Sequence, residues 1–299
     1  MRRVPVASAS AQRHACQPDR GRGVERRRVY RALAESDAPS TSGGGIAARA
    51  HLPYGISVTS PATSPGVRPC RRIYIIRHGE TLYGGQSEGA LPGADLTEQG
   101  YRQIEALAEL LAGVELDAIY ASPLGRAQAT ARTIARCSRA AVTTVDELRE
   151  IVPGNIIGKE ISEIFAAVHG FFTSPDTHWD TPYLSGETYR ALRARVWPFF
   201  EALGLRTDWR RVAVVAHGGV NNAVIGRVLG VEGPRLANVE QDFGCVNIVD
   251  FLGERPVLRL LNFTAYDPLK ARLEIPSMEV LKGLIETGFG LSLGRAEGR

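Results

Sequence analysis

The sequence is poor in cysteine and lacks any long apolar run. It has four widely spaced cysteines, Cys16, Cys70, Cys137 and Cys245. None belongs to a Cys-x-x-Cys pair or a Cys/His cluster, so we expect no metal site, and reduced thiols in a cytosolic protein are the simplest interpretation. No apolar stretch approaches the roughly 18 residues of a membrane span, and the N-terminal arginines are not followed by the apolar segment of a secretory signal. We predict a cytoplasmic protein with no membrane partner.

Acidic residues are scarce in one part of the chain only. Residues 1–72 contain 13 of the 36 Lys and Arg residues but 4 of the 32 Asp and Glu residues, a net charge of +9. Residues 73–299 hold 23 basic and 28 acidic residues, a net charge of −5. The excess of positive charge therefore belongs to the N-terminal segment, and we expect no nucleic-acid binding by the folded part of the chain.

Residues 1–68 are expected to form a disordered extension. They are rich in Arg, Ser, Ala, Gly and Pro, and Gly43–Gly45, Pro61 and Pro65 interrupt any periodicity. Three interpretations remain open: a dispensable or wrongly assigned start, an organellar transit peptide, and a tail that binds a partner. The remaining residues, 69–299, are expected to form a single domain.

From residue 73 onward, short β-branched runs alternate with amphipathic stretches. The runs predict strands at residues 73–77, 117–121, 142–145, 212–216, 245–252 and 257–263. Residues typical of helix starts precede three apolar stripes, at Thr97, Ser122-Pro123 and Ser185–Glu187. Strands that alternate with helices predict a three-layer α/β/α sandwich with a mostly parallel central sheet, with an insertion at about residues 147–188.

Two of the predicted strands end in the same way. His78 follows the first strand, His217 follows the fourth, and a glycine comes next in both places. Arg77 immediately precedes His78, and Arg126 follows the second strand at the start of a helix. Open α/β sheets bind ligands at the carboxyl ends of their strands. Two imidazoles, two guanidinium groups and helix N-termini at that edge predict an anion-binding site.

Three blocks of the sequence resemble one family. Arg77–Thr81 reads Arg-His-Gly-Glu-Thr, Ala121–Ala131 begins Ala-Ser-Pro-Leu-Gly-Arg, and Ala216–Gly219 reads Ala-His-Gly-Gly. In this order they resemble the signature of the histidine phosphatase superfamily, branch 1, whose members are phosphoglycerate mutase-like. The resemblance covers about residues 72–263 and implies the phosphoglycerate mutase-like fold. Members often carry Asn three residues after the Thr of the first block, where this sequence has Gly84.

The resemblance implies a mechanism without a metal ion or a cofactor. His78 would attack phosphorus and form a phosphohistidine, which water then hydrolyses. The other ring nitrogen of His78 would donate to a fixed acceptor, typically a backbone carbonyl. Thr81 and Gly218 are expected to contact the substrate. The oxygens of the phosphoryl group would be held by Arg77, Arg126 and His217.

A leaving alkoxide needs a proton, and two glutamates compete for the role of its donor. The segment at residues 146–151 resembles the family's Leu-x-Glu block, which matches Glu150 to the general acid. Glu147 is the alternative. Gly186-Glu187-Thr188 resembles a further family block, in which Glu187 is expected to cap a helix or to support the catalytic residues.

Three functions follow from these patterns. The first is a metal-independent phosphomonoesterase that hydrolyses a small phosphorylated metabolite. The second is a phosphoglycerate mutase-type phosphotransferase, which requires that the phosphohistidine be shielded from water. The third is a non-catalytic domain that binds a phosphorylated ligand; it is disfavoured because neither the nucleophile nor any residue of the phosphate clamp is missing. The sequence leaves the oligomeric state open, and a homodimer is one candidate.

Overall fold

The computed structural model describes residues 70–82, 95–154, 160–174, 179–231 and 239–288. All of them belong to the second of the two units into which the chain divides, Arg49–Arg299. The predicted extension, residues 1–68, lies outside the described residues, as does Gly84. The predicted division of the chain at residue 69 therefore stays a prediction.

A six-stranded sheet forms the centre of the fold, in the order β3-β2-β4-β1-β5-β6. The strands β3, β2, β4 and β1 are mutually parallel, β5 pairs antiparallel with β1, and β6 pairs antiparallel with β5. The sheet is therefore mostly parallel, as predicted. Its strands are β1 (Arg71–Arg77), β2 (Ala118–Ala121), β3 (Val142–Thr144), β4 (Arg211–Ala216), β5 (Val246–Leu252) and β6 (Arg255–Phe263).

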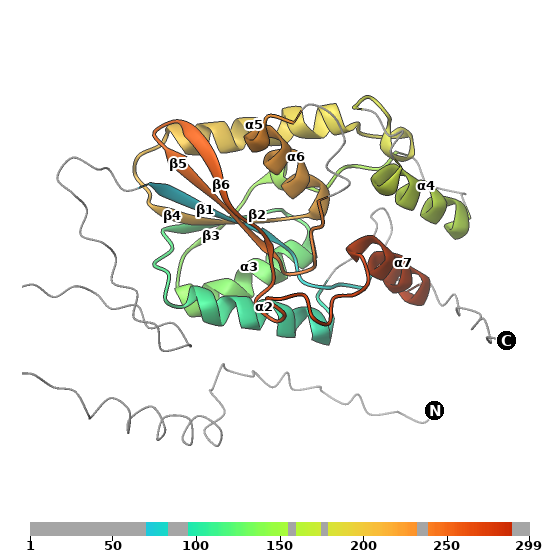
Figure 1. Ribbon diagram of the computed structural model, residues 1–299, viewed down its shortest axis with the longest axis horizontal. Coiled ribbons are helices and arrows are strands. Elements are labelled where there is room, and N and C mark those ends of the chain that lie inside the picture. The colour runs from blue at the N-terminus through green and yellow to red at the C-terminus, as the bar shows by residue number, and fades with distance from the viewer. Residues whose placement is uncertain (1–69, 83–94, 155–159, 175–178, 232–238, 289–299) are drawn as a thin grey trace, which may run out of the picture. The chain divides into compact units, whose positions relative to one another are not determined.

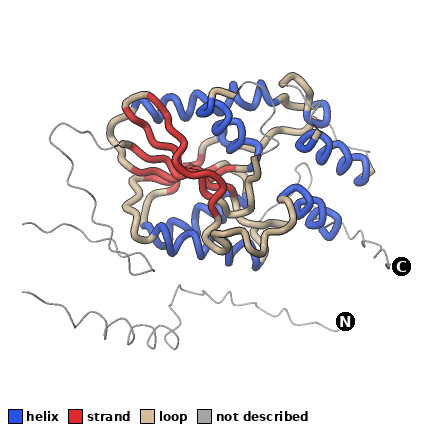
Figure 2. Tube along the Cα trace, in the orientation of Figure 1, coloured by secondary structure: helices blue, strands red, loops and turns tan. Residues whose placement is uncertain are grey.

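Helices cover both faces of this sheet. On β1, Ile73 and Ile75 face one apolar core, while Tyr74 and Ile76 face another. Burial on both faces explains why β1 is apolar along its length instead of alternating. Figures 1 and 2 show the two helix pairs on opposite sides of the sheet, which confirms the predicted three-layer sandwich. The pairs are α5 (Tyr189–Leu205) with α6 (Gly218–Leu229), and α2 (Glu98–Leu111) with α3 (Gly125–Ser138).

The register of the sheet brings the two histidines to the same edge. Arg77 of β1 lies opposite Ala216 of β4, so His78 and His217 follow at the same level of two neighbouring parallel strands. The strand β2 pairs with β4 up to Ala121, which brings the connection from β2 to α3 to this edge as well. The residues from which the sequence predicts an anion site therefore lie at the carboxyl ends of β1, β2 and β4.

The starts of α2 and α3 differ in how well the sequence predicts them. The helix α2 begins after Thr97, whose hydroxyl accepts a hydrogen bond from the backbone N–H of Gly100 at 2.9 Å, so this cap is confirmed. The predicted cap at Ser122 is wrong, because α3 begins at Gly125. The Ser122 hydroxyl instead accepts from the backbone N–H of Leu124 at 3.3 Å, which forms a local turn before the helix.

The start of α5 is also later than predicted. Ser185 has a left-handed backbone (φ of 65°), so the chain is still turning where the cap was expected. The cap is Thr188, whose hydroxyl accepts from the backbone N–H of Ala191 at 3.1 Å. Pro198 lies within α5, and the helix continues past it to Leu205.

The insertion and the C-terminal part of the described chain add two helices at the carboxyl ends of the parallel strands. Figure 1 shows α4 (Ile161–Thr173) and α7 (Ser277–Gly288) on that side of the molecule. They contact each other, and His169 Nε2 lies 2.8 Å from Glu279 Oε1 between them. The insertion also contains two short 3₁₀ helices, Asp146–Leu148 and Tyr183–Ser185.

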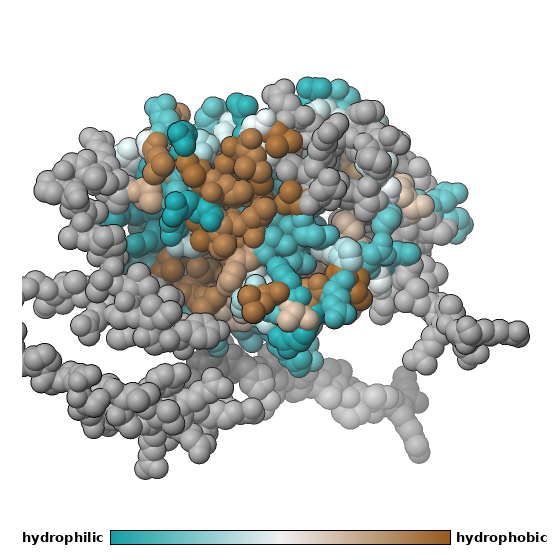
Figure 3. All heavy atoms as spheres, viewed as in Figure 1, coloured by the Kyte–Doolittle hydropathy of each residue, from teal (hydrophilic) through white to brown (hydrophobic). Residues whose placement is uncertain are grey.

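The strand β6 forms one edge of the sheet, and its side chains are incompletely covered. Figure 3 shows apolar side chains gathered in the region of β5 and β6, where Leu258 and Leu260 are half-buried and Leu261 is exposed. A homodimer stays one candidate for the oligomeric state. Among the residues that the structure describes, no helix is both long enough and apolar enough to cross a membrane.

Candidate active site

His78 lies at the carboxyl end of β1 with both ring nitrogens engaged. Its Nδ1 lies 2.8 Å from the carbonyl oxygen of Gly79, and its Nε2 accepts a hydrogen bond from Nε of Arg126 at 3.2 Å. An acceptor beside Nδ1 and a donor beside Nε2 place the hydrogen on Nδ1 and leave a lone pair on Nε2. Burial, reinforced by the positive charges of Arg126 and Arg77, holds the pKa of His78 well below 6.5. The ring is therefore neutral at neutral pH, which is the nucleophilic form.

The turn after His78 is held tightly against α2. A Cβ atom on Gly79 would lie 2.7 Å from the carbonyl oxygen of Gly100 and 2.9 Å from Cγ1 of Ile104. The backbone N–H of Gly79 donates to Thr130 Oγ1 of α3 at 3.1 Å. Glycine is therefore required at position 79 because backbone and side-chain atoms of α2 approach it closely.

His217 occupies the cap position of α6, next to His78. The two ring centres are 5.1 Å apart. Nε2 of His217 lies 2.8 Å from Ser122 Oγ, whereas its Nδ1 is buried and has no hydrogen-bond partner among the described residues. Burial, with the positive charge of Arg126 as the next cause, holds the pKa of His217 well below 6.5. A buried ring nitrogen without a partner is the kind of group that an anionic ligand satisfies.

Two arginines bring permanent positive charge to the same place. Arg77 and Arg126 are 5% and 6% exposed. Arg77 NH1 donates to the carbonyl of Gln241, and its Cζ lies 3.9 Å from the centre of the Phe243 ring. Nε of Arg77 is buried and has no hydrogen-bond partner in the described chain. Arg126 is the second residue of α3, on the turn where the helix dipole adds further positive potential.

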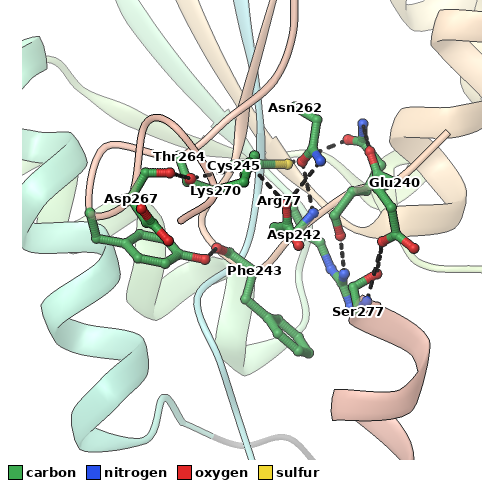
Figure 4. Close-up of polar contacts among 12 residues, drawn as sticks. Arg77, Glu240, Asp242, Phe243, Cys245, Asn262, Thr264, Asp267, Lys270 and Ser277 are labelled. Carbon is green, nitrogen blue, oxygen red and sulfur yellow. Dashed lines mark hydrogen bonds and ion pairs between the residues drawn. The ribbon is translucent and has the colours of Figure 1, made fainter. Parts of the chain in front are cut away.

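A turn just before β5 holds Arg77 and His78 in place. The backbone N–H of Gly244, a residue with φ of 67°, donates to the carbonyl of His78 at 3.0 Å. Figure 4 shows this turn beside Arg77, and the carboxylate of Asp242 within it pairs with Lys270 Nζ at 2.7 Å. This turn could not be predicted from the sequence, because it has no motif and its partners lie far away in the chain.

Of the two glutamates that compete as general acid, Glu150 is the one that reaches this site. Its Oε2 accepts from the backbone N–H of Gly219 at 3.1 Å, and its Oε1 accepts from the backbone N–H of Ile151 at 2.9 Å. Gly219 follows His217 by two residues, so the carboxylate lies at the N-terminal turn of α6. Glu147 is exposed and is not part of this arrangement.

The two residues predicted to contact the substrate are placed differently. Thr81 is fully buried, and its hydroxyl donates to the carbonyl of Asp95, which ties together the two ends of the intervening loop. Gly218 begins α6 beside Arg77, and a Cβ atom there would lie 3.7 Å from Cζ of that arginine. For both residues, substrate contact stays a prediction.

The comparison with known proteins agrees with this geometry. The sequence matches the profile of the histidine phosphatase superfamily (branch 1) over residues 73–264. The chain belongs to this superfamily. The predicted family is confirmed, and named phosphatases among its relatives identify the protein as a phosphatase enzyme.

Three relatives illustrate how far the similarity of this histidine phosphatase extends. It is 29% identical to the adenosylcobalamin/alpha-ribazole phosphatase of Escherichia coli (strain K12) over 201 residues, 65% of this chain and 97% of the relative. It is 34% identical to the metal-independent phosphoserine phosphatase of Arabidopsis thaliana over 163 residues, 52% of this chain and 68% of the relative. A mycobacterial glucosyl-3-phosphoglycerate phosphatase, solved with VO3, has a TM-score of 0.54 at 26% identity and covers 64% of this chain and 98% of its own.

The candidate site thus gathers two neutral imidazoles, two fixed cations and a carboxylate at one sheet edge. Within the described ranges, no group of three or more His, Cys, Asp or Glu residues could hold a metal ion. Three supporting residues were missed from the sequence, Ser122 behind His217 and the pair Gln241 and Phe243 around Arg77. Ser122 belongs to the second of the three sequence blocks, but it was predicted to be a helix cap and not a partner of His217.

Proposed function

We propose that this histidine phosphatase hydrolyses a small phosphate monoester through a phosphohistidine on His78. The observation that carries the proposal is the state of that ring. Nδ1 is tied to the Gly79 carbonyl, and the Nε2 lone pair points toward the Arg126 guanidinium. A neutral imidazole whose unprotonated nitrogen lies beside a fixed cation is arranged to attack an anion that the cation binds, once the anion takes over the hydrogen bond from Arg126.

The first step transfers the phosphoryl group to the enzyme. Nε2 of His78 forms a bond to phosphorus while the bond from phosphorus to the ester oxygen breaks, and the electron pair stays on that oxygen. Protonated Glu150 then supplies the proton that the leaving alkoxide needs. Its position on the Gly219 N–H, beside the histidine pair, supports this role.

The second step returns the enzyme to its starting state. Water attacks phosphorus, the bond between phosphorus and Nε2 breaks, and the Glu150 carboxylate takes the proton from the attacking water. Inorganic phosphate leaves, and His78 regains its lone pair. The same carboxyl group therefore acts as an acid in the first step and as a base in the second.

The oxygens of the transferred phosphoryl group are held by donors that have no partner in the described protein or that can turn toward an anion. Nε of Arg77 and Nδ1 of His217 are buried without partners in the described chain. If the Ser122 hydroxyl donates to Nε2 of His217, Nδ1 carries the hydrogen and becomes a donor. Together with Arg126, these groups stabilise the negative charge of the phosphoryl group in the transition state.

The relatives support a small substrate without naming one for this chain. Their names refer to alpha-ribazole, phosphoserine and glucosyl-3-phosphoglycerate phosphatases. These have in common a phosphate monoester on a small metabolite. We therefore propose this substrate class, and we retain the cytoplasm as the proposed compartment.

Hydrolysis of p-nitrophenyl phosphate in the presence of EDTA tests the proposal. The wild-type protein should release phosphate, and His78→Ala should fall to the background rate. A wild-type rate that disappears with EDTA and returns with a divalent cation would refute the metal-independent mechanism. A His78→Ala variant as active as the wild type would refute the nucleophile. A panel of phosphorylated metabolites then separates hydrolysis, which releases phosphate, from a mutase, which returns an isomeric phosphate ester.

A further inference from the structure

Arg195 of α5 directs all five of its N–H groups at the segment that carries Glu150 and at one carboxylate beside it. NH1 donates to the carbonyl oxygens of Glu147 and Arg149 at 2.7 and 3.1 Å, and NH2 donates to that of Glu150 at 3.4 Å. Nε and NH2 donate to the two carboxylate oxygens of Glu187 at 3.0 and 2.8 Å. A guanidinium has five N–H donors, so none is left over for a substrate.

Glu187 extends this contact to the other side of Glu150. Its Oε2 also accepts from the backbone N–H of Val152 at 3.0 Å, and its own backbone N–H donates to the Val152 carbonyl at 2.8 Å. The side chains of Arg195 and Glu187 are 25% and 13% exposed, so water competes weakly for this bidentate pair. The pair therefore holds backbone groups both before and after the proposed acid.

The same segment is anchored on its apolar side. Leu148 and Ile151 flank Glu150 and are buried in the core beneath α5 and α6. With the backbone fixed by Arg195 and these two side chains in the core, the carboxylate of Glu150 is directed toward Gly219 at the start of α6. Proton transfer requires the acid to lie within hydrogen-bond reach of the leaving oxygen, and a misplacement of about 1 Å costs up to about 100-fold in rate.

We propose that Arg195, acting with Glu187, is a positioning residue that holds Glu150 within reach of the leaving-group oxygen. This inference rests on the proposed function, in which Glu150 protonates the leaving group. A different role for Arg195 is purely electrostatic, because its charge also contributes to the low pKa of His217. A lysine at position 195 distinguishes the two roles. It keeps the positive charge, so it would preserve an electrostatic role, but it lacks the planar set of donors that positioning requires.

The test compares two substrates in four proteins: wild type, Arg195→Met, Arg195→Lys and Arg206→Met. One substrate is p-nitrophenyl phosphate, whose leaving group needs no proton, and the other is an alkyl phosphate that the wild type hydrolyses. Arg206→Met is the matched control, because Arg206, at the C-cap of α5, also forms a bidentate pair, with Asp208 at 3.0 and 2.8 Å. That pair lies at the C-terminal end of α5, beside Tyr120.

We expect kcat/KM for the alkyl phosphate to fall by about 10- to 100-fold in both Arg195 variants, while kcat/KM for the aryl phosphate, which does not depend on the later attack of water, falls less than about 3-fold. Arg206→Met should change both rates equally and by less than about 2-fold. The retained aryl activity shows that each variant is folded. If Arg195→Met does not fold, Arg195→Lys alone tests the positioning role, because it keeps the positive charge and removes only the additional donors.

Equal losses on the two substrates, or a fully active Arg195→Lys, would overturn the positioning role. Failure of the proposed function gives a different pattern. A wild type inactive on both substrates refutes phosphatase chemistry at this site. A Glu150→Gln variant with no difference between aryl and alkyl substrates refutes the acid itself, whatever the Arg195 variants do.

Discussion

The two buried histidines should make the stability of this protein fall as the pH is lowered from 8 to 5.5. His78 and His217 are fully buried, and both have pKa values held well below 6.5. In the unfolded chain they take up protons below the ordinary pKa of about 6.5, whereas the folded state does not. The unfolded state therefore binds more protons, so the free energy of unfolding decreases as the pH falls. At pH 5.5 each histidine contributes up to about 1.4 kcal/mol of destabilisation relative to pH 8, and the pair up to about 2.8 kcal/mol, the limit for rings that stay fully neutral in the folded state.

Equilibrium urea unfolding at pH 8.0 and pH 5.5, followed by circular dichroism, measures this difference. The comparison is between the wild type and the single variants His78→Asn and His217→Asn, each of which removes one of the two titrating rings from the site. Each variant should lose about half of the pH dependence that the two histidines contribute, up to about 1.4 kcal/mol. The subtraction removes the contribution of every other titrating group. Variants that keep the full wild-type pH dependence would refute the reasoning, because the rings would then not be held neutral by the fold.

Three further predictions concern activity. Glu150→Gln should reduce kcat/KM for alkyl phosphates by about 10²- to 10⁴-fold and for aryl phosphates much less, and equal losses would point to another acid. Gly219→Ala places a Cβ atom 2.5 Å from Glu150 Oε1 and should displace that carboxylate, so it should also reduce alkyl activity more than aryl activity. Alanine itself favours the helix, so a loss of helix stability does not explain this result. Wild-type activity on alkyl phosphates would contradict the position of Glu150. Phe243→Leu removes the ring stacked on Arg77 and should raise KM by about 2- to 10-fold in steady-state assays with little change in kcat, whereas an unchanged KM would show that the ring does not position Arg77.

The framework of the site could be predicted from the sequence because its signals are local. The strands β1 and β4 are continuous apolar runs, and each is followed by a histidine and a glycine. The sequence alone therefore indicates that both histidines lie at the end of a strand. The cap at Thr97 is equally local, because its hydroxyl and the Gly100 N–H are three residues apart. The strand order was not predicted, because β1 pairs with β4 instead of with β2, the next strand in the chain.

The supporting residues could not be predicted, because their partners lie far away in the chain. Ser122 looks like a helix cap, but its hydroxyl lies beside His217, 95 residues later. The carbonyl of Gln241 that fixes Arg77 belongs to a turn without any motif. Arg195 is an ordinary helical arginine in the sequence, and only the fold shows that three of its donors meet the segment of Glu150 and two meet Glu187.

The central claim is that His78 carries the phosphoryl group during turnover. Wild-type protein mixed with excess substrate, quenched at alkaline pH and digested, should yield a peptide whose phosphate is on His78 and is lost in acid. Glu150→Gln with an aryl phosphate should form the same phosphopeptide, because that leaving group needs no proton. Phosphate found on another residue would contradict this claim. So would turnover by the wild type without a burst of product and without a phosphopeptide at any quench time.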